Sequence, residues 1–215
     1  MTYGLLAAIG AVFVYQLSLG AEVERLVHVR GFIPARVGRI FDSGNPVALL
    51  ELAQSILTSM FLHGGWLHVI GNVLYLRVFG DNVEDRFGRL EFAAFYLLSG
   101  VAGALGQYAA HPTSTVPMIG ASGAIAGVLG AYIVLFPTAR IVTLFPVFIF
   151  LTFIEIPAVV FLGIWAAQQL LNGYWALDPN VGTPVAWFAH LGGFAFGVSV
   201  GLLYRVMRGR VRRRK

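Results

Sequence analysis

The middle of the 215-residue chain reads Gly120-Ala121-Ser122-Gly123-Ala124-Ile125-Ala126-Gly127, and this run of small residues opens an apolar segment. Its only hydroxyl belongs to Ser122, and no side chain larger than alanine lies within two positions of it. The last apolar segment begins with a comparable stretch, Ala189-His190-Leu191-Gly192-Gly193. Because a serine hydroxyl becomes a strong nucleophile only when a base takes its proton, we expect Ser122 and His190 to meet.

The composition is that of a membrane protein. The chain is 58% hydrophobic and 12% charged, whereas soluble globular proteins carry about a quarter charged residues. Basic residues gather after the last apolar segment, which predicts a cytoplasmic tail over 206–215. This placement favours the lipid bilayer as the partner and argues against nucleic acid, although the net charge is +5.

Cofactor chemistry has little support in the sequence. The chain has no cysteine, which excludes disulfides, thiolate nucleophiles and Cys-ligated metals. His63 and His68 are interrupted by Gly64-Gly65 and joined by no carboxylate, which is a poor arrangement for metal ligands on one helix. We therefore expect neither a metal nor another cofactor.

Apolar segments separated by charges and prolines predict an all-α membrane protein with six transmembrane helices in a single domain over residues 1–215. The expected spans are about 3–19, 66–79, 92–110, 122–136, 156–171 and 185–206.

Three connecting stretches are also assigned. Residues 21–63 mix charged with aromatic and aliphatic side chains, which is typical of a segment at the membrane interface. Residues 141–173 are too many for one crossing, so we expect 141–154 to be interfacial or re-entrant. A short charged loop should end the second span at Asp81, Glu84, Asp85, Arg86 and Arg89.

Four polar residues occupy corresponding places in this arrangement. With a basic tail inside, six spans put both termini in the cytoplasm of a multi-pass cell-membrane protein, and spans two, four and six begin at the outer face. His68, Asn72, Ser122 and His190 lie near these beginnings. We expect them at a similar shallow depth, where they can satisfy one another's need for polar partners.

Glycine spacing predicts which helices touch. Gly123 and Gly127 share one face of the fourth span, and Gly193 and Gly197 repeat that spacing in the sixth. Small residues four apart let helix backbones approach closely. We expect the fourth and sixth spans to pack through these faces.

The same polar residues predict an acyl-transfer site. His68 and Asn72 are four residues apart and share a helix face, so both can donate to an oxyanion, with the backbone N–H of Ser122 as a further donor. No Asp or Glu lies in the outer half of a neighbouring span to orient the imidazole. We therefore expect a Ser–His dyad rather than a triad.

The chain resembles the rhomboid family of intramembrane serine proteases in its basic six-span bacterial or archaeal form. Three motifs in order make this specific: His68-x-x-x-Asn72, Gly120-x-Ser122-Gly123 and Ala189-His190-x-x-Gly193-x-x-x-Gly197. The segments 61–68 and 79–85 also match the family, and the resemblance covers about the whole chain.

The resemblance implies that Ser122 is the nucleophile, His190 the general base, and His68 and Asn72 the oxyanion-stabilising pair. It implies single-pass transmembrane proteins as substrates, cut near their outer end, and a membrane-embedded first loop. Some members pack an aromatic residue, four positions after the serine, against the histidine. Ala126 stands there in this chain, so other groups must orient His190.

Two other function classes stay open at this level: a small transporter or channel, and a non-catalytic member that binds transmembrane clients. The chain shows no internal repeat, which disfavours a transporter. It keeps both Ser122 and His190, which disfavours a non-catalytic member, because such a member is expected to lack one of them. The sequence leaves the oligomeric state open. It also leaves Gln168 and Gln169 as either packing contacts or residues facing a water pocket.

Overall fold

The structure is a computed structural model that describes residues 1–147, 150–178 and 185–212. Its elements in chain order are α1 (Thr2–Ser18), η1 (Gly20–Glu22), α2 (Val23–Arg30), α3 (Ala35–Ser43), α4 (Pro46–Ser59), α5 (Trp66–Phe87), α6 (Arg89–Ala110), α7 (Ser122–Leu135), β1 (Arg140–Val147), β2 (Phe150–Pro157), α8 (Ala158–Trp175) and α9 (Trp187–Arg212). The protein is therefore mostly helical, as its long apolar segments predict.

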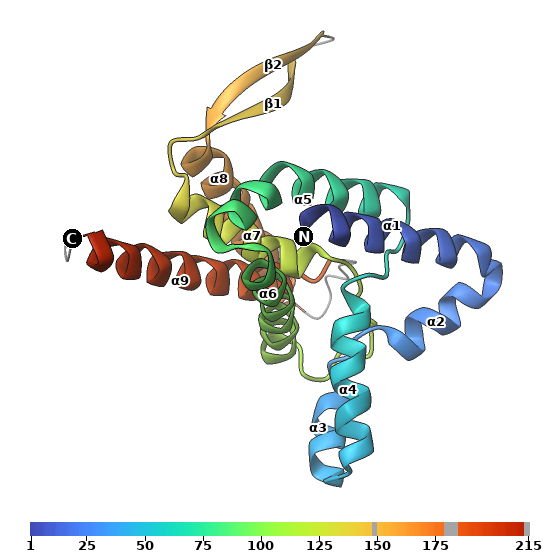
Figure 1. The fold of residues 1–215 in the computed structure, drawn as a ribbon. Coiled ribbons are helices and arrows are strands. Elements are labelled where there is room, and N and C mark those ends of the chain that lie inside the picture. Colours follow the sequence, from blue (N-terminus) through green and yellow to red (C-terminus); the bar gives the residue numbers. More distant parts are fainter. Residues whose placement is uncertain (148–149, 179–184, 213–215) are drawn as a thin grey trace.

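Helix α7 is the central element of the fold. It packs against α5, α6, α8 and α9, and all its residues from Gly123 to Tyr132 are buried (Figure 1). The helix has 14 residues, which makes it about 21 Å long at 1.5 Å per residue. This is shorter than the hydrocarbon core of a bilayer, about 30 Å. A helix of this length leaves room for a cavity at one of its ends.

Glycines bring α7 and α9 into backbone contact. A methyl group on Gly193 would overlap the carbonyl oxygen of Gly123, and one on Gly197 would overlap the carbonyl oxygen of Gly127. Helix α6 packs on the same pair, since a methyl group on Gly103 would lie 2.8 Å from the carbonyl oxygen of Ala189. Three backbones therefore approach as closely as small residues allow.

The all-α prediction is wrong over residues 140–147 and 150–157. β1 and β2 pair as an antiparallel hairpin, with Arg140 opposite Pro157, and Figure 1 shows it projecting from the body beside α8. Val142, Thr143 and Ile154 are β-branched, and such side chains favour strands over helices. Whether this hairpin lies at the membrane interface, as expected for 141–154, stays a prediction.

The charged loop expected after the second span is also wrong, because α5 continues through it to Phe87. Arg77 pairs with Asp81 one turn later at 2.6 Å, an arrangement that supports a helix. The helix ends at Gly88, whose φ of +96° favours glycine. The charges therefore mark the end of the apolar stretch and not the end of the helix.

Two described helices, Arg89–Ala110 and Trp187–Arg208, are long and apolar enough to cross a membrane on length and composition. Thr2–Ser18 and Ser122–Leu135 are apolar but shorter. The six-span arrangement is not confirmed by this measure and stays a prediction.

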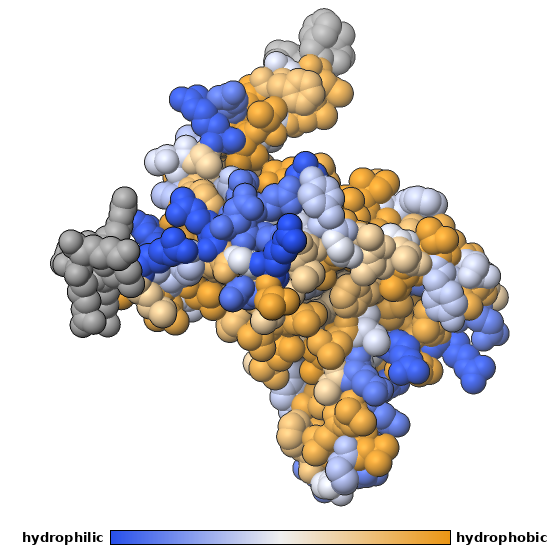
Figure 2. Space-filling model, in the orientation of Figure 1, coloured by the Kyte–Doolittle hydropathy of each residue, from blue (hydrophilic) through white to orange (hydrophobic). Residues whose placement is uncertain are grey.

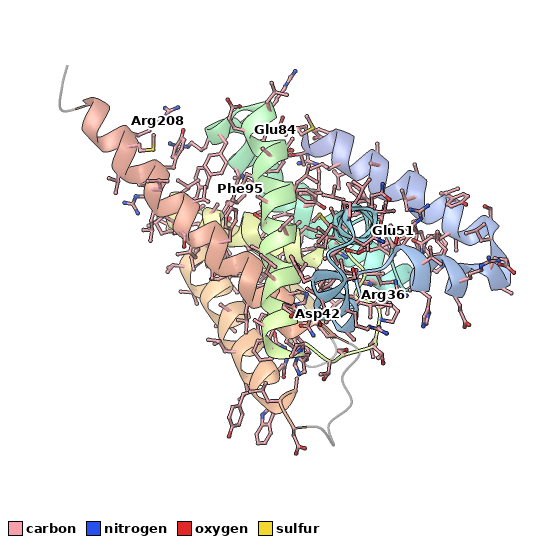
Figure 3. The ribbon with its side chains drawn as sticks, turned by 90° about the horizontal axis from the view of Figure 1, so that it is seen from below. Arg36, Asp42, Glu51, Glu84, Phe95 and Arg208 are labelled. Atoms are coloured by element: carbon pink, nitrogen blue, oxygen red, sulfur yellow. The ribbon has the colours of Figure 1, made fainter. Side chains whose placement is uncertain are left out.

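The surface is unusually apolar, with hydrophobic residues over much of the face in Figure 2 and a hydrophilic band between the end of α9 and the middle of that view. In Figure 3 the charged residues Arg36, Asp42 and Glu51 of α3 and α4 lie apart from Glu84 and Arg208. These charged side chains therefore lie in separate regions of the molecule.

Candidate active site

The site begins with two side chains that the fold brings together from α7 and α9. The Ser122 Oγ lies 2.8 Å from the Nε2 atom of His190, within hydrogen-bond distance. Ser122 is the first residue of α7, and His190 lies in the first turn of α9. The glycine contacts between these helices make the approach possible, because a larger side chain at Gly193 would separate their backbones.

The other ring nitrogen of His190 has a partner that sequence reasoning missed. Its Nδ1 lies 2.8 Å from the Oε1 atom of Gln169 on α8. Gln169 is 4% exposed, whereas its neighbour Gln168 is exposed. A glutamine on an otherwise apolar helix was the available signal, but the sequence does not show which of the two glutamines faces the site.

Two tryptophan rings complete the surroundings of His190. The Trp165 ring lies 6.1 Å from the imidazole centroid at an interplanar angle of 36°, and the Trp187 ring lies at 6.1 Å and 90°. Ala126, where some relatives carry an aromatic residue, is fully buried. The imidazole is therefore flanked by aromatic rings from α8 and α9 instead of one from α7.

His68 and Asn72 lie around Gly120, two residues before Ser122 in the chain. A methyl group on Gly120 would lie 2.6 Å from the Nε2 atom of His68 and 3.7 Å from the Nδ2 atom of Asn72. The backbone N–H of Gly64 donates to the Nδ1 atom of His68 at 3.4 Å, so Nε2 carries the proton and is a donor. Within the described residues the buried Nδ2 of Asn72 has no hydrogen-bond partner.

These groups border a cavity of about 900 Å³, lined among others by Ser122, His190, His68 and residues 116–120. Asn72 is not among the lining residues and is 6% exposed, so it lies behind the cavity wall at Gly120. The structure thus gathers all four sequence-predicted polar residues in one region, with Asn72 the least accessible.

Comparison with known proteins gives the family. A family model described as "Rhomboid domain" matches residues 51–206, which include all four polar residues. The chain belongs to the rhomboid family. Members of this family are integral membrane proteins, and the apolar surface of this one is consistent with that setting.

Several relatives of this rhomboid are known. It is 36% identical over 76 residues to RHOMBOID-like protein 5 of Arabidopsis thaliana, which covers 35% of this chain and 25% of the plant protein. It is 33% identical over 156 residues to Rhomboid protein 1, mitochondrial, of Saccharomyces cerevisiae, covering 68% and 40%. It is 31% identical over 168 residues to the mouse Presenilin-associated rhomboid-like protein, mitochondrial, covering 74% and 40%. The matched parts span a quarter to two fifths of these relatives' own length.

The loop before Ser122 in this rhomboid is fixed by hydrogen bonds to the segment between α2 and α5. Phe32 and Met118 exchange backbone hydrogen bonds of 3.1 and 2.7 Å, and the N–H of Gly120 donates to the carbonyl of Ser59 at 2.8 Å. One wall of the cavity therefore depends on residues 31–59. These bonds hold the stretch that carries Gly120 against His68.

No group of three or more metal-binding side chains occurs in the part of the chain that the structure describes. His63 approaches His68 with ring centroids 5.0 Å apart, but its Nδ1 donates to the carbonyl of Phe61 at 3.1 Å. Gln16 of α1 binds both the N–H and the carbonyl of His63, at 2.9 and 3.0 Å. His63 therefore belongs to the supporting structure around His68.

Proposed function

We propose that this rhomboid is a serine endopeptidase that cleaves single-pass transmembrane proteins near the outer membrane face, with Ser122 and His190 as its catalytic pair. The observation that carries the proposal is the 2.8 Å approach of the Ser122 Oγ to the Nε2 atom of His190 at the wall of a cavity. A hydroxyl beside an unprotonated imidazole nitrogen is the arrangement that nucleophilic catalysis requires.

In the first half of the reaction the Ser122 Oγ attacks the carbonyl carbon of the scissile peptide bond, and its proton passes to the Nε2 of His190. The tetrahedral intermediate collapses when the C–N bond breaks and the imidazolium returns the proton to the leaving amine. The product of this half is an ester between Ser122 and the N-terminal part of the substrate.

Three donors can stabilise the oxyanion of the intermediate. They are the Nε2–H of His68, the Nδ2–H of Asn72 and the backbone N–H of Ser122 at the start of α7, where helix N–H groups lack intrahelical acceptors. The unpartnered Nδ2 of Asn72 supports this role. A buried donor without a partner costs stability, and binding an oxyanion during the reaction would explain why the protein keeps one here.

In the second half a water molecule attacks the ester carbonyl while His190 takes its proton, and the Ser122 Oγ leaves with that proton. The cavity of about 900 Å³ has room for water beside Ser122. Because α7 is about 21 Å long, a bundle that crosses the bilayer can place Ser122 below the outer surface and still leave it open to this cavity.

The membrane placement is part of the proposal. In this proposal the protein crosses the cell membrane six times and both of its termini lie in the cytoplasm. This topology puts the cavity on the outer side. Arginines around the end of α9 (Arg205, Arg208, Arg210 and Arg212) support the cytoplasmic assignment of that end. The last three residues of the predicted tail, 213–215, lie outside the described residues.

A fluorophosphonate probe tests the proposal directly, because it reacts with an activated serine. We expect it to label the purified wild-type protein and not Ser122→Ala, and the wild type to cut a single-pass transmembrane substrate in detergent micelles. A transporter or a non-catalytic client-binding protein would show neither labelling nor cleavage. Absence of both from a folded wild-type protein would refute the proposal.

A further inference from the structure

We infer that Gln169 is a positioning residue of this site, whose side-chain oxygen accepts a hydrogen bond from His190 and fixes the imidazole in the tautomer that can act as a base. The inference rests on the proposed function and adds a third, neutral member to the Ser122–His190 pair. Its starting point is the 2.8 Å distance between the Nδ1 of His190 and the Oε1 of Gln169.

The orientation of the Gln169 amide follows from its second contact. Its Nε2 donates to the backbone carbonyl of Trp165 at 3.2 Å, one helical turn earlier in α8. A carbonyl only accepts hydrogen bonds, so the amide nitrogen must face Trp165 and the amide oxygen must face His190. Both contacts of the buried side chain are then satisfied, whereas the opposite orientation would set the amide oxygen against the carbonyl oxygen of Trp165, and two acceptors form no hydrogen bond.

The tautomer of His190 follows in turn. An amide oxygen accepts, so the Nδ1 of His190 must carry a hydrogen. In a neutral imidazole the Nε2 atom then has a free lone pair, and this is the atom that lies 2.8 Å from the Ser122 Oγ. One glutamine on α8 thereby decides which imidazole nitrogen is available to take the serine proton.

A neutral acceptor suits this environment better than a carboxylate. Gln169 is 4% exposed, and an ionised side chain at such a place in a membrane protein is costly. No ion pair among the described residues includes His190. The dipole of the Gln169 amide can therefore stabilise the imidazolium that forms when Ser122 attacks, without a buried charge in the resting protein.

A packing role alone does not account for these contacts. Gln168 and Gln169 are adjacent on α8, and only Gln169 is buried against α9. A hydrophobic residue would fill the same space without leaving a buried amide that needs hydrogen-bond partners. The glutamine is explained by the two directional bonds that it makes.

Three variants separate positioning from packing. Gln169→Met keeps approximate size and removes the acceptor, Gln169→Glu keeps an acceptor oxygen, and Gln168→Met makes the first change at the exposed neighbour. We expect Gln169→Met to lower kcat for a single-pass substrate about 10- to 100-fold, the effect of leaving a buried donor unpaired, with KM nearly unchanged. Gln169→Glu should recover part of that kcat, and Gln168→Met should match the wild type.

A kcat of Gln169→Met within about twofold of the wild type would overturn the inference while leaving Ser122 and His190 as proposed. Equal losses of kcat and thermal stability in Gln169→Met and Gln169→Glu would assign Gln169 to packing and overturn it as well. Failure of the proposed function is distinct, because it would show as cleavage that survives Ser122→Ala.

A measurement without catalysis tests the inference independently. In protein labelled with ¹⁵N-histidine, nuclear magnetic resonance reports which ring nitrogen carries the proton. The His190 signal should show a protonated Nδ1 in the wild type and in Ser122→Ala, and a mixture of tautomers in Gln169→Met. A His190 protonated at Nε2 in the wild type would contradict the assignment even if the protein cleaves nothing.

Discussion

Gly197 of α9 lies so close to Gly127 of α7 that a single methyl group on Gly197 would overlap the Gly127 carbonyl oxygen. The neighbouring pair of Gly193 and Gly123 has the same relationship one turn nearer the site. These contacts set the separation of the two helices that carry His190 and Ser122. The distance between the two side chains is therefore a consequence of backbone packing.

Gly197→Ala should destabilise the protein by about 1–3 kcal/mol, the usual range for overpacking, because the added methyl meets backbone that cannot move aside. Gly163→Ala in α8 is the matched control, since a methyl there meets nothing within 4 Å. In an open helix interior, alanine stabilises by about 0.5–1 kcal/mol relative to glycine. Detergent unfolding curves should thus shift in opposite directions. A stable Gly197→Ala would disprove the close packing.

Ser122→Ala and His190→Ala should each abolish cleavage of a single-pass substrate in detergent while leaving the thermal unfolding temperature near that of the wild type. The reason is that the hydroxyl supplies the nucleophile and the imidazole removes its proton. Substantial cleavage by either folded variant would rule out the pair.

Asn72→Ala should reduce kcat by about 100- to 1,000-fold, the range observed when one oxyanion donor is lost elsewhere. The affinity for the substrate should change little, because the donor acts on the intermediate. Asn82→Ala provides the control on the same helix, since Asn82 is exposed. An unchanged kcat in Asn72→Ala would remove Asn72 from this role.

Gly120→Ala should lower kcat roughly tenfold or more, because small displacements of catalytic groups are costly. The glycine has a φ of +120°, and its methyl would lie 2.6 Å from the Nε2 of His68, which must move. Gly44→Ala is the control: its φ is +58°, but the space around it is open. Equal kcat in Gly120→Ala and Gly44→Ala would contradict the expected displacement of His68 by the methyl group.

His63 should make stability depend on pH. Burial and then the neighbouring His68 lower the pKa of His63 from 6.5 to about 4, against its hydrogen bond to Phe61, which raises it. As the pH falls below about 6.5, His63 binds a proton in the unfolded state, whereas in the folded state it stays neutral until about pH 4. The free energy of unfolding should therefore decrease between about pH 7 and pH 4, by about 2 kcal/mol at pH 5.

Detergent unfolding of the wild type and His63→Asn at both ends of this range isolates that contribution, because other titrating groups are common to both proteins. The variant should lose less stability on acidification than the wild type. Parallel loss in the two proteins would show that His63 titrates normally in the folded state.

Several features of this fold are local enough to be predicted from the sequence. The spacing of Gly193 and Gly197 places them on one helix face, and the structure has them against α7. The polar residues near the starts of α5, α7 and α9 were identifiable because a polar group among apolar ones needs a partner. The pairing of β1 with β2 was missed because the apolar run that contains these strands has no period that separates strand from helix.

The sequence by itself determined the apolar composition typical of a membrane protein, the glycine faces of the helices and the identity of the serine and histidine. Each of these depends on composition or on residues close together in the chain. Tertiary structure alone decided what holds His190. Gln168 and Gln169 differ by about 100° around α8, and only the rotation of that helix in the bundle turns one of them to the Nδ1 atom. That rotation is set by packing against α9 and α7, which no local pattern contains.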